Sequence, residues 1–152
     1  MEPTRWAKSP ERLVAFIDDD SSMREAAGDL LRSNHLPVEV FASAEDFLGY
    51  ARIDEVACLV VDVIMPRMSG FDLQSHLARQ GRSLPTVFVS AQSKPALIAR
   101  ARQLGAVFLP KPFSEIGLLG ALRTVCGERL ELPAPARAPH VKAQRNPGSR
   151  SA

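Results

Sequence analysis

Cysteine is scarce in this chain of 152 residues, and the little that is present has no recognisable spacing. The two cysteines, Cys58 and Cys126, are too far apart in sequence to match a metal-binding or redox motif. Cys58 lies within an apolar run and is expected to be a core residue. Both cysteines fit a reducing cytoplasm, which is the location that we predict.

Long hydrophobic runs are also missing. No apolar stretch approaches the roughly 20 residues that a helix needs to cross a bilayer, and the N-terminus lacks the apolar core of a signal peptide. There is no Gly-rich loop ending in Lys-Ser or Lys-Thr, which argues against a P-loop NTPase. The three histidines, His35, His76 and His140, show no ligand spacing and are expected at the surface. We therefore expect neither export nor a membrane partner.

Charge is distributed unevenly along the chain. The net charge is +2, but residues 133–152 hold four Lys or Arg and no Asp or Glu, so residues 1–132 carry −2. The stretch 131–152 is rich in Pro, Ala and Arg without hydrophobic periodicity, and we predict a disordered tail that contains no DNA-binding helix-turn-helix. Residues 1–11 are predicted to be a flexible arm, which leaves one domain over residues 12–130.

Short apolar segments alternate with amphipathic ones, the pattern of a parallel α/β sheet. The predicted strands span residues 13–17, 37–42, 59–62, 85–91 and 106–109. Because a helix follows each strand, the strands should pair in parallel through right-handed crossovers. Three strands are near-continuous apolar runs, which predicts helices on both faces of a doubly wound, flavodoxin-like α/β fold. Periodicity does not fix the strand order, but the order 2-1-3-4-5 would place the first and third strands side by side.

Several helix ends are predicted from capping patterns. Ser22 and Ser69 each begin a sequence with capping-box spacing, and Ser93 is expected to cap the fourth helix. Asn34 is expected to take the left-handed conformation that ends the first helix. The apolar face of the last helix is expected to include Ile116.

Side chains capable of chemistry occur where four predicted strands end. They are Asp18 and Asp19 after the first strand, Asp62 at the end of the third, Ser90 at the end of the fourth and Lys111 after the fifth. Each alone has an ordinary explanation as a turn former, helix-start charge or surface lysine. In the order 2-1-3-4-5, however, the first and third strands would form the crevice where such sheets bind ligands.

Three carboxylates in one crevice would repel each other, and Mg²⁺, which prefers oxygen ligands, would remove that repulsion. A cation, a lysine and a hydroxyl directed at one carboxylate suit a transferring phosphoryl group.

These segments resemble the receiver domain of bacterial response regulators, in particular receivers of DNA-binding regulators. The resemblance covers roughly residues 12–127. It is carried by Ile17-Asp18-Asp19, Asp62-Val63-Ile64-Met65-Pro66 with Met68 and Gly70, Val89-Ser90-Ala91, and Lys111-Pro112-Phe113. Each motif is weak by itself, but their order and spacing are specific.

The resemblance implies that Asp62 accepts a phosphoryl group from a sensor histidine kinase or a phosphotransfer protein. It implies a Mg²⁺ ion bound by Asp19, Asp62 and the backbone carbonyl of Ile64, with Asp18 acting through a water molecule. Lys111 would pair with the phosphorylated carboxylate.

The resemblance also implies a conformational switch. Ser90, in place of the commoner threonine, would move to the phosphoryl group, and Phe108 occupies the position of the switch aromatic. Simple packing in the last strand explains Phe108 equally well. The Lys111–Pro112 bond would be cis. Phosphorylation would alter the face formed by the fourth helix, the fifth strand and the fifth helix, where a protein partner or a second copy of the chain would bind.

Two other functions fit parts of the pattern. A degenerate receiver would bind proteins without taking a phosphoryl group, but the complete set of strand-end residues argues against it. A Mg²⁺-dependent phosphohydrolase with an aspartate nucleophile typically needs a second acid two residues later, where this chain has Ile64. We therefore predict a phosphorylated signalling protein rather than an enzyme. Because the apolar side chain of Ile64 cannot position a water molecule for hydrolysis, the phosphoryl group on Asp62 should be long-lived.

Overall fold

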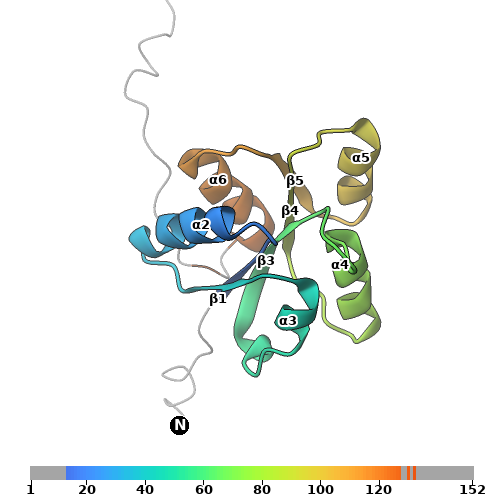
Figure 1. Ribbon diagram of the computed structural model, residues 1–152, viewed down its shortest axis with the longest axis horizontal. Coiled ribbons are helices and arrows are strands. Elements are labelled where there is room, and N and C mark those ends of the chain that lie inside the picture. The colour runs from blue at the N-terminus through green and yellow to red at the C-terminus, as the bar shows by residue number, and fades with distance from the viewer. Residues whose placement is uncertain (1–12, 128–129, 131, 133–152) are drawn as a thin grey trace, which may run out of the picture.

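Five parallel strands form one sheet in the order β2-β1-β3-β4-β5, which confirms the predicted doubly wound α/β fold. The computed structural model describes residues 13–127, 130 and 132 (Figure 1). The strands are β1 (Leu13–Ile17), β2 (Val38–Phe41), β3 (Val56–Asp62), β4 (Thr86–Ser90) and β5 (Val107–Pro110). The helices are α2 (Ser21–Ser33), α3 (Ala44–Leu48), α4 (Gly70–Arg79), α5 (Pro95–Gln103) and α6 (Glu115–Cys126), with a 3₁₀ turn, η1 (Ile53–Glu55), before β3.

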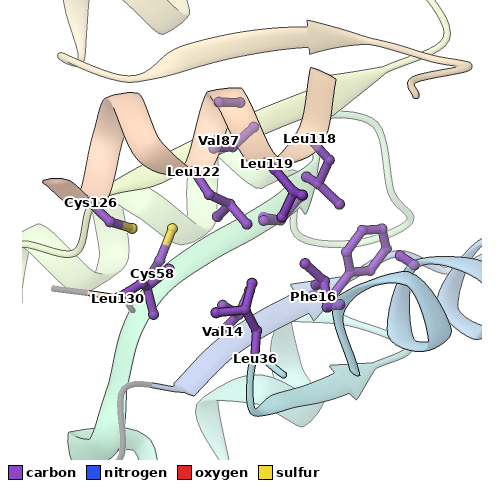
Figure 2. Close-up of a cluster of buried hydrophobic side chains, with 14 of the residues drawn as sticks. Val14, Phe16, Leu36, Cys58, Val87, Leu118, Leu119, Leu122, Cys126 and Leu130 are labelled. Atoms are coloured by element: carbon purple, nitrogen blue, oxygen red, sulfur yellow. The ribbon is translucent and has the colours of Figure 1, made fainter. Parts of the chain in front are cut away.

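The helices cover both faces of the sheet. Helices α2 and α6 lie on one face, and α3, α4 and α5 lie on the other (Figure 1). Every residue of β1 is buried, and successive side chains enter opposite layers. Val14 and Phe16 pack on the α2–α6 side, where Figure 2 shows them with Leu118 and Leu122 of α6, whereas Ala15 packs on the other side. Burial on both faces explains the continuous apolar runs.

The chain returns to the core after α6. Gly127, with φ of 56°, follows the last turn of that helix, and Leu130 is only 4% exposed within the α2–α6 layer. Figure 2 shows Leu130 close to Cys58, which is buried as expected. Leu132, which the sequence placed in the tail, packs against the same layer. The predicted arm and residues 133–152 of the predicted tail lie outside the described residues.

The ends of α2 differ from the prediction. Its N-cap is Asp20, not Ser22, because the Asp20 side chain accepts hydrogen bonds from the N–H groups of Ser22 and Met23. A carboxylate in this position also interacts favourably with the positive end of the helix dipole. The left-handed residue beyond α2 is His35, with φ of 61°, whereas Asn34 has φ of −101°.

The other helix starts give a mixed result. The capping box at Ser69 is confirmed, since its side chain and that of Asp72 bond reciprocally to the backbone. The prediction that Ser93 caps α5 is wrong, because the N-cap is Lys94 and no side chain makes a capping hydrogen bond. Ile116 was also wrongly placed, because α6 turns that side chain outward, leaving it 71% exposed.

Within residues 13–127, 130 and 132, no helix is both long and apolar enough to cross a membrane.

Candidate functional site

The acidic residues singled out in the sequence meet at the carboxyl ends of the central strands. Asp18 follows β1, and Asp62 is the last residue of β3, the strand beside it. Asp18, Asp19 and Asp62 each offer one carboxylate oxygen, and these three oxygens lie within 4.8 Å of one another. The β2-β1-β3-β4-β5 order therefore places three acids in the crevice where the chain switches sides of the sheet.

Lys111, which follows β5, supplies a positive charge to two of these acids. Its Nζ donates hydrogen bonds to Asp18 Oδ2 at 2.7 Å and to Asp62 Oδ2 at 3.0 Å. The lysine side chain is 13% exposed and that of Asp18 is fully buried. Asp18 Oδ1 also accepts a hydrogen bond from the Asp20 N–H, so both Asp18 oxygens are engaged. Asp18 is thus placed to hold Lys111 in position against Asp62.

The proton affinities of Asp62 and Lys111 reflect this environment. Burial raises the pKa of the Asp62 carboxyl, the hydrogen bond from Lys111 opposes the rise, and the negative charge of Asp18 adds to it. Burial by itself would lower the pKa of Lys111, but hydrogen bonds to Asp18 and Asp62 and the charges of both acids outweigh it and raise that pKa. Lys111 therefore stays charged at neutral pH, whereas ionised Asp62 is costly to bury.

The donor atoms fit a small hard cation such as Mg²⁺, which is bound by oxygen and usually by one or two carboxylates. Asp19 is exposed, and no described residue donates a hydrogen bond to its carboxylate. Lys111 bonds to Asp62 Oδ2, and among the described residues the other oxygen, Oδ1, accepts only the N–H of Ile64, at 3.2 Å. Asp19 and Asp62 therefore retain oxygen lone pairs that a cation could use.

The predicted switch residues lie on the two strands that follow β3 in the sheet, Ser90 on β4 and Phe108 on β5. Ser90 is buried at the end of β4, one residue beyond the register partner of Asp62, and its Oγ accepts the N–H of Gln92 at 3.0 Å. Phe108 lies opposite Phe88 in the β4–β5 pair and packs partly buried in the layer under α3, α4 and α5. The Lys111–Pro112 peptide bond is cis.

Two contacts with the acid cluster could not be read from the sequence. The Arg24 guanidinium donates from Nη1 to the backbone carbonyl of Asp18 at 2.8 Å. Gly70 packs so closely that a Cβ there would lie 2.6 Å from the carbonyl oxygen of Asp62. An arginine in the first turns of a helix normally suggests only a solvated side chain, and a glycine after a loop suggests only a turn.

Replacing Lys111 by methionine should destabilise the metal-free protein, because buried Asp18 and Asp62 would lose their counter-charge. Removing one partner of a fully buried ion pair costs about 3–5 kcal/mol, and for the partly exposed Lys111 we expect roughly 2 kcal/mol. Mg²⁺ should restore much of the loss by neutralising the same acids. Thermal melts in chelator and in Mg²⁺ measure both effects, with the exposed Lys94→Met as the control. Equal melting of Lys111→Met and wild type in chelator would contradict this.

Comparison with protein-family models identifies the class of protein. The model described as "Response regulator receiver domain" matches residues 14–123. The chain belongs to the response regulator receiver family of two-component signalling. Its fold and its acidic pocket of Asp18, Asp19 and Asp62 are those expected of a phosphoacceptor receiver, a signalling module rather than an ordinary enzyme.

Individual relatives agree with this assignment. The response regulator protein TmoT of Ectopseudomonas mendocina is 41% identical over 115 residues, covering 75% of this chain and 52% of TmoT. The transcriptional regulatory protein FixJ of Azorhizobium caulinodans is 36% identical over 124 residues, covering 80% of this chain and 59% of FixJ. The chain thus spans about half the length of these curated relatives.

Solved structures show the same fold. The crystal structure of FixJ-N is 28% identical, with a TM-score of 0.69 over 81% of this chain and 97% of FixJ-N. The chemotaxis protein CheY4 of Vibrio cholerae is 26% identical, with a TM-score of 0.69 over 75% of this chain and 98% of CheY4.

Proposed function

We propose that Asp62 accepts a phosphoryl group from the phosphohistidine of a sensor histidine kinase or a phosphotransfer protein. The observation that supports this most strongly is the convergence of Asp18, Asp19 and Asp62 with Lys111 at the carboxyl ends of the strands. Phosphoryl transfer needs mainly a positioned nucleophile and positive charge around the phosphoryl oxygens, and these residues supply both.

In the proposed reaction, an Asp62 carboxylate oxygen attacks phosphorus as the phosphorus–nitrogen bond to the donor histidine breaks. The bonding electron pair returns to the imidazole nitrogen, and the product is an acyl phosphate on Asp62. Mg²⁺, held by Asp19, Asp62 and the Ile64 backbone carbonyl, with Asp18 acting through water, would neutralise charge on the phosphoryl oxygens. Lys111 orients Asp62 beforehand and would pair with the phosphorylated side chain afterwards.

The signal would leave the site through Ser90. Its hydroxyl now accepts the Gln92 N–H, so a move toward the phosphoryl group would remove that hydrogen bond from the loop before α5. Helix α5 has no side-chain cap and only one buried residue, Ala101, so its position should change readily when this hydrogen bond is lost. With Phe108 following Ser90, the change would alter the face formed by α5, β5 and α6, where a protein partner or a second copy would bind.

Intact mass after incubation with acetyl phosphate tests the proposal. We expect the gain of one phosphoryl group in Mg²⁺ and none in chelator. No gain with folded protein and Mg²⁺ present would instead favour a degenerate receiver that binds partners without phosphorylation.

Replacing Ile64 by asparagine should shorten the life of the phosphorylated state. Ile64 lies two residues after Asp62 and is 48% exposed, so it meets the solvent that would hydrolyse the acyl phosphate. An asparagine there could orient a water molecule, and we expect dephosphorylation to accelerate by several-fold up to about a hundredfold, which reaches only the lower limit of the effect of positioned proton-transfer groups. The decay of phosphorylated protein, followed by intact mass, measures this. Ile116→Asn, at the other exposed isoleucine, is the control, and equal decay of Ile64→Asn and wild type would contradict the expectation.

A further inference from the structure

Of the three clustered acids, Asp19 has the carboxylate that is held by the fewest hydrogen bonds from described residues. Asp18 is held by Lys111 and by the Asp20 N–H, and Asp62 by Lys111 and the Ile64 N–H. The exposed Asp19 carboxylate receives no hydrogen bond from a described residue. The direction of this side chain is therefore set mainly by the backbone between Asp18 and Asp20.

Arg24 fixes that backbone from α2. Its Nη1 donates to the Asp18 carbonyl, the oxygen of the peptide that joins Asp18 to Asp19, at 2.8 Å. The same residue also closes the first helical turn, since its backbone N–H bonds to the Asp20 carbonyl at 3.0 Å. Arg24 is partly buried, so its side chain lies against the protein. One residue thus ties the Asp18–Asp19 peptide to the start of α2.

We propose that Arg24 is a positioning residue for the metal site, which acts by holding the Asp18–Asp19 peptide so that the Asp19 carboxylate faces Asp62. This inference rests on the proposed function, because it assigns Asp19 and Asp62 to the cation. Arg24 touches neither the cation nor the phosphoryl group in this role. Hydrogen-bonded residues behind a metal ligand commonly change metal affinity by 10–100-fold when they are replaced.

Positioning and simple charge predict opposite results for the loss of Arg24. A nearby positive charge repels Mg²⁺, so if Arg24 acted through its charge alone, removing it would tighten Mg²⁺ binding. If it holds the peptide, removing it lets Asp19 turn away and weakens binding. The sign of the change in Mg²⁺ affinity therefore separates the two roles.

The test is calorimetric titration of Mg²⁺ alone into wild type, Arg24→Ala, Arg24→Lys and the control Arg32→Ala. Arg32 lies two turns along α2, is exposed and pairs weakly with Asp29 at 3.5 Å, so the control removes the same charge from the same helix. Circular dichroism and thermal melts in chelator verify that each variant is folded. We expect about tenfold weaker binding in Arg24→Ala, partial recovery in Arg24→Lys, and wild-type affinity in Arg32→Ala.

Unchanged or tighter Mg²⁺ binding in folded Arg24→Ala, with a wild type that binds normally, would overturn this inference and leave the proposed function standing. A wild type that binds no Mg²⁺ would overturn both. Equal weakening in Arg24→Ala and Arg32→Ala would also overturn the inference, because a general property of α2 would then explain the loss.

Discussion

Asp62→Asn is expected to gain no phosphoryl group from acetyl phosphate while remaining folded. The variant keeps the size of the side chain but removes the anionic oxygen that attacks phosphorus. We also expect it to melt at or above the temperature of wild type in chelator at neutral pH. Because burial raises the pKa of Asp62, its ionised form is disfavoured in the folded state, and the neutral amide avoids that cost.

The pH dependence of stability gives a second test of the same variant. A raised pKa means that ionised Asp62 lowers stability above that pKa, and that this cost disappears as the pH falls and the carboxyl takes up its proton. The difference in melting temperature between Asp62→Asn and wild type should therefore narrow in acid. Asp29→Asn, an exposed change on α2 away from the acid cluster, is the matched control. An Asp62→Asn protein that melts well below wild type at neutral pH would contradict the conclusion that ionised Asp62 lowers the stability of the folded state.

Gly70→Ala is expected to damage both stability and phosphorylation. Gly70 is the first residue of α4, and its N–H donates to the Val63 carbonyl at 3.0 Å. An added Cβ would lie 2.6 Å from the Asp62 carbonyl oxygen and 3.2 Å from Val63 Cα, both backbone atoms that cannot move aside cheaply. We expect a loss of about 1–3 kcal/mol, the usual cost of overpacking. We also expect at least tenfold slower phosphorylation, because small displacements of a reacting group are costly.

Gly120→Ala is the matched control for this effect. Gly120 lies inside α6 and has nothing within 4 Å of an added Cβ, so alanine should stabilise the helix by up to about 1 kcal/mol. Denaturant unfolding and the rate of mass gain with acetyl phosphate measure both variants. A Gly70→Ala protein with wild-type stability and rate would show that the contact with Asp62 does not constrain the site.

The fold could be predicted because the pattern of apolar residues in each strand indicates whether that strand is buried on one face or on both. The continuous apolar run of β3 requires helices on both faces, and the acids and the lysine fall at strand ends that a parallel sheet must bring to one edge. Helix ends were less predictable. Ser22 and Asp20 can both cap a helix, and only the three-dimensional path of the chain selects Asp20.

Contacts made through the backbone were not predictable. The link from Arg24 to the Asp18 carbonyl depends on the direction of a long side chain, and the approach of Gly70 to Asp62 depends on the path of the loop between them. Neither of these two contacts has a recognisable pattern in the sequence. The exposure of Ile116 was missed for a related reason, since helical periodicity leaves a choice of face that only packing settles.

The most direct test of the central claim is to locate the phosphoryl group. Protein phosphorylated by acetyl phosphate in Mg²⁺ would be reduced with borohydride, which converts an aspartyl phosphate into homoserine, and then digested for peptide mass spectrometry. The phosphoacceptor assignment predicts homoserine at position 62 and unmodified Asp18 and Asp19. Reduction at Asp18 or Asp19 instead, or a phosphoryl group that survives on a serine, would contradict it.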